Sequence, residues 1–134
     1  MGEPINQELA AAVASLGLET FHRHIFLCVD ADEPKCCSKE ASLESWEYLK
    51  KRLKELKLVG PAPLVYRTRA NCLRVCTNGP IAVVYPECLW YRSCSPSVLE
   101  QIIQSHLIQG VIVVEFAFAK NSAINSKLSE SGSV

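Results

Sequence analysis

The order of its expected elements places this chain among α/β proteins, as one domain in which a small sheet packs against helices. Two short apolar, β-branched runs flank an amphipathic helix, and an antiparallel hairpin and a closing helix follow. With 134 residues the chain is long enough for one hydrophobic core. Its residues are 49% hydrophobic and 21% charged, which is ordinary for a soluble globular protein.

The N-terminal half is predicted to contain a helix, a strand and a second helix. Residues 6–16 are Ala-rich and begin with Asn6, a good N-cap, so they indicate a helix. Residues 24–29, HIFLCV, are typical of a buried strand. Ser42 is the candidate N-cap of the next helix, which we expect to end near Leu58. The apolar stripe of that helix is Trp46, Leu49, Leu53 and Leu56.

The C-terminal half is predicted to contain a strand, a hairpin and a closing helix. Residues 64–68 alternate in polarity as a strand does. Residues 81–85 are a continuous apolar run, which a Pro-Glu-Cys turn connects to a second short strand at residues 89–91. Ser95-Pro96 opens a helix as N-cap and first-turn proline. A parallel β-α-β unit followed by a hairpin and a closing helix indicates a thioredoxin-like α/β sandwich.

The chain is predicted to divide into three parts. These are an N-terminal helical extension (1–23), one folded domain (24–119) and a polar, Ser-rich tail (120–134) whose composition is typical of disorder. Within the domain, residues 111–118 are apolar enough for a further strand or for an arm packed on a neighbouring molecule.

Charge and hydropathy exclude several classes of function. The formal net charge is zero, so we expect no nucleic-acid partner. The longest apolar runs are too short to span a bilayer, so we expect no membrane insertion. The first residues lack the basic and apolar regions of a secretory signal, which predicts a reducing, cytoplasmic location.

Seven cysteines are the unusual feature of the composition. In a reducing compartment they favour metal binding over disulfides, and an odd number cannot pair completely within one chain. Two of them, Cys88 and Cys94, fit plain buried thiols. The full set is Cys28, Cys36, Cys37, Cys72, Cys76, Cys88 and Cys94.

The other five cysteines fall where two loops are expected to meet. Cys28 ends the first strand, and Cys36-Cys37 lies in the loop after it. Cys72 and Cys76 lie in the loop after the parallel neighbour, so four sulfurs can surround one point. The C-x-x-x-C spacing disfavours a thioredoxin-type dithiol catalyst. Zinc and a two-iron cluster both accept four thiolates; the lack of C-x-x-C knuckles favours the cluster, and both remain open.

Several segments of this pattern resemble the thioredoxin-like [2Fe-2S] ferredoxins, most of all the form found in photosynthetic bacteria. These segments are HIFLC, C-SKEAS, C-LRV-C-TNGP, and IAVVYPE with WY. The resemblance runs from His24 to about Gly110, and the module is also similar to the small iron–sulfur subunit of NADH:quinone oxidoreductases. It implies a one-electron carrier rather than an enzyme, with one low-potential [2Fe-2S] cluster per chain. Redox partner proteins are expected, and a homodimer is left open.

The resemblance also implies the ligands of the cluster. By position they are Cys28, Cys37, Cys72 and Cys76. Cys37 is preferred to Cys36 because the family's second ligand lies five residues before the small residue that opens the helix, here taken as Ser42. Backbone amides of Thr77-Asn78-Gly79 are expected to donate hydrogen bonds to the sulfurs.

The chain departs from the family at Cys88, where the turn usually has glycine. A positive φ at this position would strain a cysteine.

The basic stretch Lys50–Lys57 offers a dock for an acidic reductase, although such a run is more often a solvated helix face. Two other functions stay open: a zinc-stabilised or metal-free interaction module, and a thiol- or cluster-based redox sensor.

Overall fold

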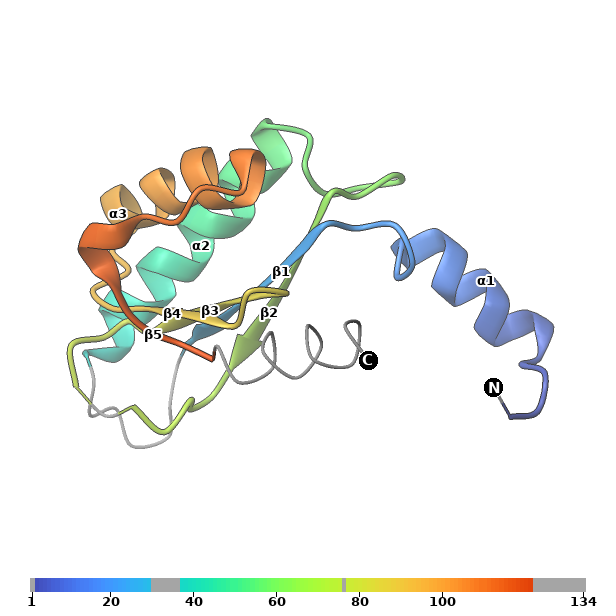
Figure 1. The fold of residues 1–134 in the computed structure, drawn as a ribbon, viewed down its shortest axis with the longest axis horizontal. Coiled ribbons are helices and arrows are strands. Elements are labelled where there is room, and N and C mark those ends of the chain that lie inside the picture. The colour runs from blue at the N-terminus through green and yellow to red at the C-terminus, as the bar shows by residue number, and fades with distance from the viewer. Residues whose placement is uncertain (1, 30–36, 76, 122–134) are drawn as a thin grey trace, which may run out of the picture.

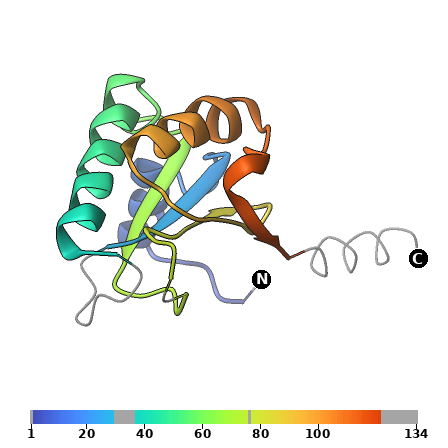
Figure 2. The same cartoon turned by 90° about the vertical axis from the view of Figure 1, so that its left-hand side faces the viewer.

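A computed structural model of the chain describes residues 2–29, 37–75 and 77–121, in which a five-stranded sheet carries helices on one side (Figure 1). The helices are α1 (Gln7–Leu16), α2 (Lys39–Glu55), α3 (Pro96–Gln101), the π-helix η1 (Ile102–Leu107) and the 3-10 helix η2 (Val114–Phe116). The strands are β1 (Arg23–Cys28), β2 (Val65–Ala70), β3 (Ala82–Tyr85), β4 (Leu89–Tyr91) and β5 (Ala117–Lys120). Seen from two sides, α2 and α3 lie together over the same face of the sheet (Figure 2).

The strand order β2-β1-β3-β4-β5 confirms the predicted β-α-β unit and hairpin. β1 and β2 are parallel, and β3, β4 and β5 extend the sheet in antiparallel fashion. The sequence left residues 111–118 open between a strand and an arm. In the structure they pass through η2 into β5, which pairs with β4 and forms one edge of the sheet.

The start of α2 differs from the sequence prediction. Ser38 is the N-cap, because its Oγ accepts a hydrogen bond from the Ala41 N–H at 3.1 Å. Ser42 lies inside the helix, buried, where its hydroxyl donates to the Lys39 carbonyl at 2.9 Å. The prediction that Ser42 caps this helix was therefore wrong, and the helix ends at Glu55 rather than near Leu58.

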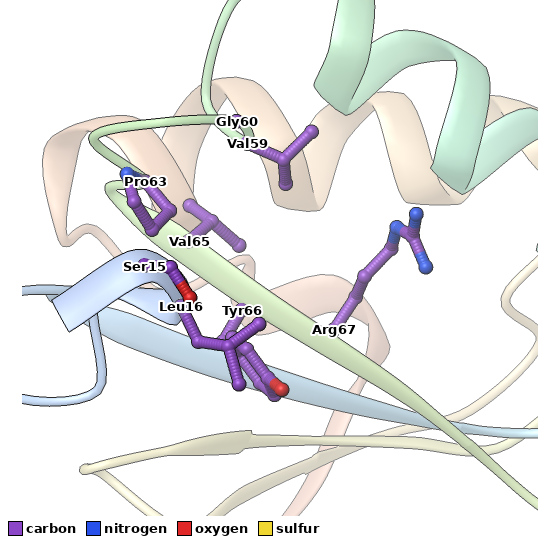
Figure 3. A pocket seen from close by; sticks show the side chains of 8 residues that line it. All are labelled: Ser15, Leu16, Val59, Gly60, Pro63, Val65, Tyr66 and Arg67. Atoms are coloured by element: carbon purple, nitrogen blue, oxygen red, sulfur yellow. The ribbon is translucent and has the colours of Figure 1, made fainter. Parts of the chain in front are cut away.

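Helix α1 has well-formed ends but little contact with the rest of the chain. The Asn6 side chain accepts from the Leu9 N–H at 2.8 Å, and Gly17 closes the helix in the left-handed conformation (φ 65°), as the sequence predicts. No residue of α1 is buried. Its last turn forms one wall of a pocket of about 320 Å³ against β2 and the loop before it, where Leu16 lies near Tyr66 (Figure 3).

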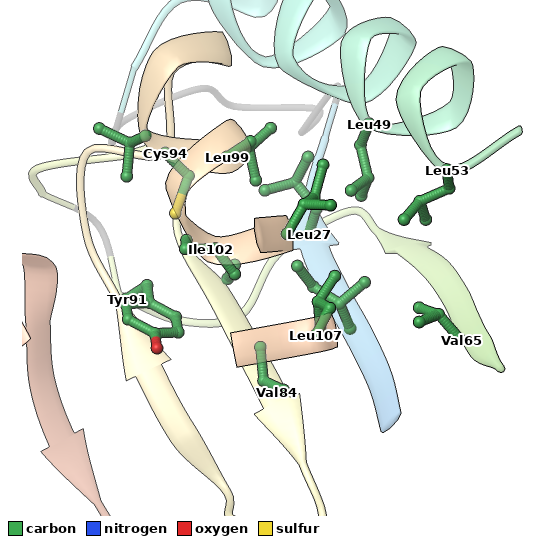
Figure 4. Packing of buried hydrophobic residues seen from close by; sticks show 14 of the residues in the cluster. Leu27, Leu49, Leu53, Val65, Val84, Tyr91, Cys94, Leu99, Ile102 and Leu107 are labelled. Atoms are coloured by element: carbon green, nitrogen blue, oxygen red, sulfur yellow. The ribbon is translucent and has the colours of Figure 1, made fainter. Parts of the chain in front are cut away.

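The hydrophobic core lies between the sheet and the helices α2, α3 and η1. The predicted apolar stripe of α2 supplies Trp46, Leu49 and Leu53, all buried. Leu27 and Tyr91 reach the same cluster from the sheet (Figure 4). Helices therefore cover one face of the sheet.

Within the described residues, none of the helices combines the length and the apolar character needed to cross a bilayer. Most of the predicted polar tail, residues 122–134, lies outside the described residues. The three-part division of the chain stays a prediction.

Candidate metal centre

The parallel pairing of β1 and β2 brings two of the predicted ligand regions to one edge of the sheet. Cys28 stands opposite Ala70 in the register, so the chain leaves both strands at the same end. The Cys28 Sγ lies 3.7 Å from the Asn71 carbonyl oxygen, directly before Cys72. The Val29 N–H donates to the Ala70 carbonyl at 2.7 Å and fixes this junction. The strands that lead into the two expected loops therefore end side by side, while the meeting of the loops stays a prediction.

Cys37 lies at the start of α2. It is half-buried and directly precedes the N-cap Ser38. The positive end of the helix dipole favours the thiolate over the thiol at such a position. With Ser42 inside the helix, the register argument that selected Cys37 loses its premise, while the place of Cys37 beside the true N-cap gives a separate reason.

A backbone amide already donates to one of the candidate sulfurs. The Arg74 N–H lies 3.3 Å from the Cys72 Sγ, and Arg74 itself has φ 72°, in the left-handed region. Such N–H···S contacts stabilise negative charge on a coordinated sulfur. Cys72 is exposed, whereas Cys28 is buried, so the candidate centre lies between the core and the surface.

The segment after Cys76 is hydrogen-bonded to the residues that follow β4. Asn78 has φ 56°, its carbonyl accepts from the Ser93 N–H at 2.7 Å, and its side chain accepts from the Thr77 hydroxyl at 2.8 Å. Donation from the amides of residues 77–79 to a sulfur stays a prediction. The Arg74 amide and the Asn71 carbonyl were missed by sequence reasoning, because backbone groups leave no signal in residue type.

Two of the candidate thiols, Cys36 and Cys76, lie outside the described residues. Among the residues that are described, no three His, Cys, Asp or Glu side chains are arranged to hold a metal ion. The structure thus brings Cys28 to the start of the Cys72 loop and places Cys37 at the start of α2. The choice between Cys36 and Cys37 stays a prediction.

The remaining two cysteines are buried thiols, as predicted. Cys94 lies in the core, where burial raises the pKa of its thiol well above the usual range, so that it stays protonated. Cys88 is buried in the turn between β3 and β4 and has φ 54°. This is the left-handed conformation considered for this position because the resembled family usually has glycine there. A hydrogen bond with Cys88 raises the pKa of Tyr85.

Two residues of the basic stretch, Lys50 and Arg52, form ion pairs within the protein. Lys50 pairs with Glu47 at 2.9 Å, and Arg52 donates to both carboxylate oxygens of Glu100 at 2.8 and 2.9 Å. The Arg52 guanidinium holds the pKa of Glu100 at about 2. These pairs tie α2 to itself and to α3, in agreement with a solvated helix face.

Comparison with known proteins gives a consistent set of relatives, although no protein-family model matches the chain. The chain is 31% identical over 94 residues to a protein of Clostridium pasteurianum named "Ferredoxin, 2Fe-2S", spanning 67% of this chain and 89% of that one. An Aquifex aeolicus protein of the same name is 26% identical over 102 residues, spanning 73% and 90%.

A solved structure agrees with these relatives in fold. The thioredoxin-like [2Fe-2S] ferredoxin of Aquifex aeolicus superposes with a TM-score of 0.62 at 26% identity, covering 76% of this chain and 94% of that one. The match has the fold class that the sequence predicts, and the N-terminal helical extension is extra to the predicted domain. The sheet order, the cysteine positions and the level of identity together show that the chain belongs to the thioredoxin-like [2Fe-2S] ferredoxin family.

Proposed function

We propose that this protein is a one-electron carrier that holds one [2Fe-2S] cluster per chain on four cysteine thiolates: Cys28, Cys37, Cys72 and Cys76. One observation carries the proposal: the β1–β2 pairing places Cys28 beside the Cys72 loop in a member of a [2Fe-2S] ferredoxin family. In this role no residue has to act as a general acid, base or nucleophile.

The residues around the site suit a negatively charged group. The start of α2 directs its positive dipole end towards Cys37, and the Arg74 amide donates to the Cys72 sulfur. Cys37 is favoured over Cys36 because it stands directly before the N-cap.

The bound cluster supplies one-electron redox chemistry at the protein surface. Four thiolates, two sulfides and two ferric ions leave a net charge of about −2, which becomes about −3 on reduction. Adding negative charge to an already negative site is unfavourable. We therefore propose a low reduction potential, on the order of −400 mV as in plant-type ferredoxins with four cysteine ligands.

The exposed Cys72 loop is the proposed point of electron exchange with partner proteins. It reaches solvent, whereas Cys28 and the core lie behind it. Lys50 and Arg52 are engaged in ion pairs, which argues against the helix face as the main dock. A cytoplasmic location fits thiols that must stay reduced until they are metallated. A homodimer is also part of the proposal.

A serine series tests the ligand set. Cys28→Ser, Cys37→Ser, Cys72→Ser and Cys76→Ser, made one at a time, should each remove most of the visible charge-transfer absorption or shift it strongly. Loss is expected because the cluster requires four ligands. The adjacent Cys36→Ser is the matched control and should leave the spectrum unchanged.

The opposite pattern at the vicinal pair, loss with Cys36→Ser and none with Cys37→Ser, would overturn the assignment of the second ligand. A chain that binds one zinc ion and stays colourless in every variant would instead support the interaction module. Circular dichroism of each variant separates loss of the cluster from loss of the fold.

A further inference from the structure

A pocket of about 260 Å³ lies next to the candidate metal centre. Among the residues that the structure describes, its lining comes from the Cys72 loop (residues 71–80), from the residues just before β3 and just after β4, and from β5: Val75, Thr77, Asn78, Ile81, Arg92 and Phe118. Val75 and Thr77 stand on either side of Cys76 in the chain. The Ile81 carbonyl accepts from the Cys28 N–H at 2.9 Å. The pocket therefore adjoins the chain at two of the proposed ligands.

Backbone hydrogen bonds hold the segments around this pocket together. The Cys94 N–H donates to the Pro80 carbonyl at 2.9 Å, which joins the end of the Cys72 loop to the residues after β4. The Arg92 N–H donates to the Phe116 carbonyl at 3.0 Å, which joins the same residues to the end of η2. A preformed pocket binds its occupant without the cost of ordering loops.

Apolar side chains make up half of the lining. Ile81 is buried, with 1% of its surface exposed, whereas Phe118 is 44% exposed. The Trp90 ring lies 6.4 Å from the Phe118 ring, so the exposed phenylalanine has a second aromatic group beside it. Large apolar side chains gathered around a hollow are typical of a surface that contacts another protein.

The size of the pocket favours a single side chain as its occupant. Sites for drug-sized small molecules have volumes of about 300–1,000 Å³, and this pocket is smaller. Interfaces between proteins often depend on one large apolar side chain that enters a pocket on the other protein. A side chain of a partner protein is therefore a better fit than a free small molecule.

Arg92 brings a positive charge to the pocket. Its Nη2 donates to the backbone carbonyl of Glu115 at 3.1 Å, and its Nη1 donates to the Ser93 hydroxyl at 3.4 Å. Its guanidinium also lies 5.5 Å from the centre of the Phe116 ring. None of the carboxylates in the described part of the chain forms an ion pair with Arg92. A guanidinium has five N–H donors, so donors remain for a carboxylate from outside.

We propose that this pocket is the docking site for an acidic segment of the redox partner. One apolar side chain of the partner packs against Ile81 and Phe118, and a neighbouring carboxylate accepts hydrogen bonds from Arg92. Opposite charges at such a contact speed the encounter and fix the orientation of the partner. The proposal names the chemistry of the partner that exchanges electrons at the Cys72 loop, and in that respect it rests on the proposed function.

Ligand-observed NMR tests the pocket with a defined peptide and the full-length protein. The probe is acetyl-Asp-Leu-Asp-amide, which places a carboxylate on either side of one leucine, and acetyl-Asn-Leu-Asn-amide is its uncharged match. Saturation transfer from the protein to the leucine methyl groups reports binding, and its concentration dependence gives the Kd. The charged peptide should bind roughly three to five times more tightly, as one partly exposed ion pair allows.

Two variants assign the binding to this pocket. Arg92→Ala should reduce the affinity of the charged peptide to that of the uncharged one, and Phe118→Ser should weaken both peptides equally. Arg67→Ala and Ile108→Ser are the matched controls, since neither residue lines the pocket. Arg67 also lies over an aromatic ring, that of Trp46 at 5.3 Å, and Ile108 is 45% exposed. Both control variants should bind the peptides as the wild type does.

Three results would overturn the proposal. The first is equal affinity of the two peptides for the wild-type chain. The second is a preference for the charged peptide that survives Arg92→Ala. The third is a preference that is lost with Arg67→Ala, which would place the binding site elsewhere. Circular dichroism of each variant separates loss of binding from loss of the fold.

Reduction of the protein tests whether the docked segment lies near the point of electron exchange. One-electron reduction with dithionite leaves an unpaired electron on a [2Fe-2S] cluster, and nuclei bound close to it relax faster. The leucine methyl signals of the charged peptide should therefore broaden when the wild-type protein is reduced, and much less when Arg92→Ala is reduced.

Iron and sulfide content of the same wild-type samples separates the two proposals. A chain that contains iron and sulfide but does not broaden the peptide signals on reduction would overturn the docking role and leave the carrier function standing. A colourless chain without iron would instead contradict the proposed function, while the affinities of the two peptides would still test the pocket.

Discussion

His106 is the centre of a buried polar network that sequence reasoning left unassigned. The Tyr91 hydroxyl accepts from the Val113 N–H at 3.0 Å, so its own hydrogen is free to donate to His106 Nδ1 at 2.9 Å. The His106 Nε2–H then donates to Glu87 at 2.9 Å, and Arg23 donates to the same carboxylate. Burial favours a neutral His106, and in the neutral ring these bonds are satisfied with the proton on Nε2.

The network predicts the titration of His106. Burial lowers its pKa below the usual 6.5, and the hydrogen bond to Glu87 only partly opposes this; Arg23 and Lys120 act in the same direction as burial. Nitrogen-15 NMR of the ring should show a neutral Nε2–H form that persists below pH 6.5. Titration above pH 6.5, or a proton on Nδ1, would contradict this assignment of the network.

A consequence for stability follows from the same pKa shift. Because the unfolded chain binds a proton at His106 more readily than the folded protein, this group's contribution is complete above pH 6.5. It is lost as the pH falls from 6.5 towards the folded-state pKa. Burial alone would raise the pKa of Glu87, but hydrogen bonds from Arg23 and His106 outweigh it and lower this pKa, so further stability is lost below the usual carboxylate range.

At the scale of elements, the N-terminus of α2 links the fold to the candidate centre. Ser38→Ala removes the hydroxyl that accepts from the Ala41 N–H and should cost about 1 kcal/mol of unfolding free energy. Ser42→Ala is the matched control and should cost less, since this hydroxyl lies inside the helix and donates to the Lys39 carbonyl instead of accepting from a first-turn N–H. Urea unfolding followed by circular dichroism measures both, and a larger loss for Ser42→Ala would restore Ser42 as the cap.

Local sequence patterns predicted most helices and strands because their signals are local. The period of Trp46, Leu49 and Leu53 and the cap at Asn6 depend on neighbours within one or two turns. The cap of α2 was misassigned because Ser38 and Ser42 are chemically identical, and only packing decides which one starts the helix. The pairing of β5 with β4 joins distant segments, which periodicity does not report.

Part of the candidate site could also be predicted from the sequence. Cys28 and the loop of Cys72 could be expected at one edge because parallel strands end together, and the register confirms that β1 and β2 end side by side. The Arg74 amide lies beside Cys72 because Arg74 has a left-handed backbone. The sequence gives no signal for this conformation, since it is uncommon at residues other than glycine.

At the scale of the whole molecule, the proposed function depends on one end of the sheet. At this end β1 and β2 finish side by side, and Cys28 lies beside the start of the Cys72 loop. The central claim concerns this end of the sheet. It requires that the folded chain bind iron and sulfide rather than merely bury its thiols.

Metal and sulfide analysis of the protein purified without oxygen, together with its visible spectrum, tests that claim most directly. We predict about two irons and two acid-labile sulfides per chain, visible charge-transfer bands, and uptake of one electron per chain on reduction. A colourless, folded protein that contains one zinc ion or no metal, and takes up no electron, would contradict it.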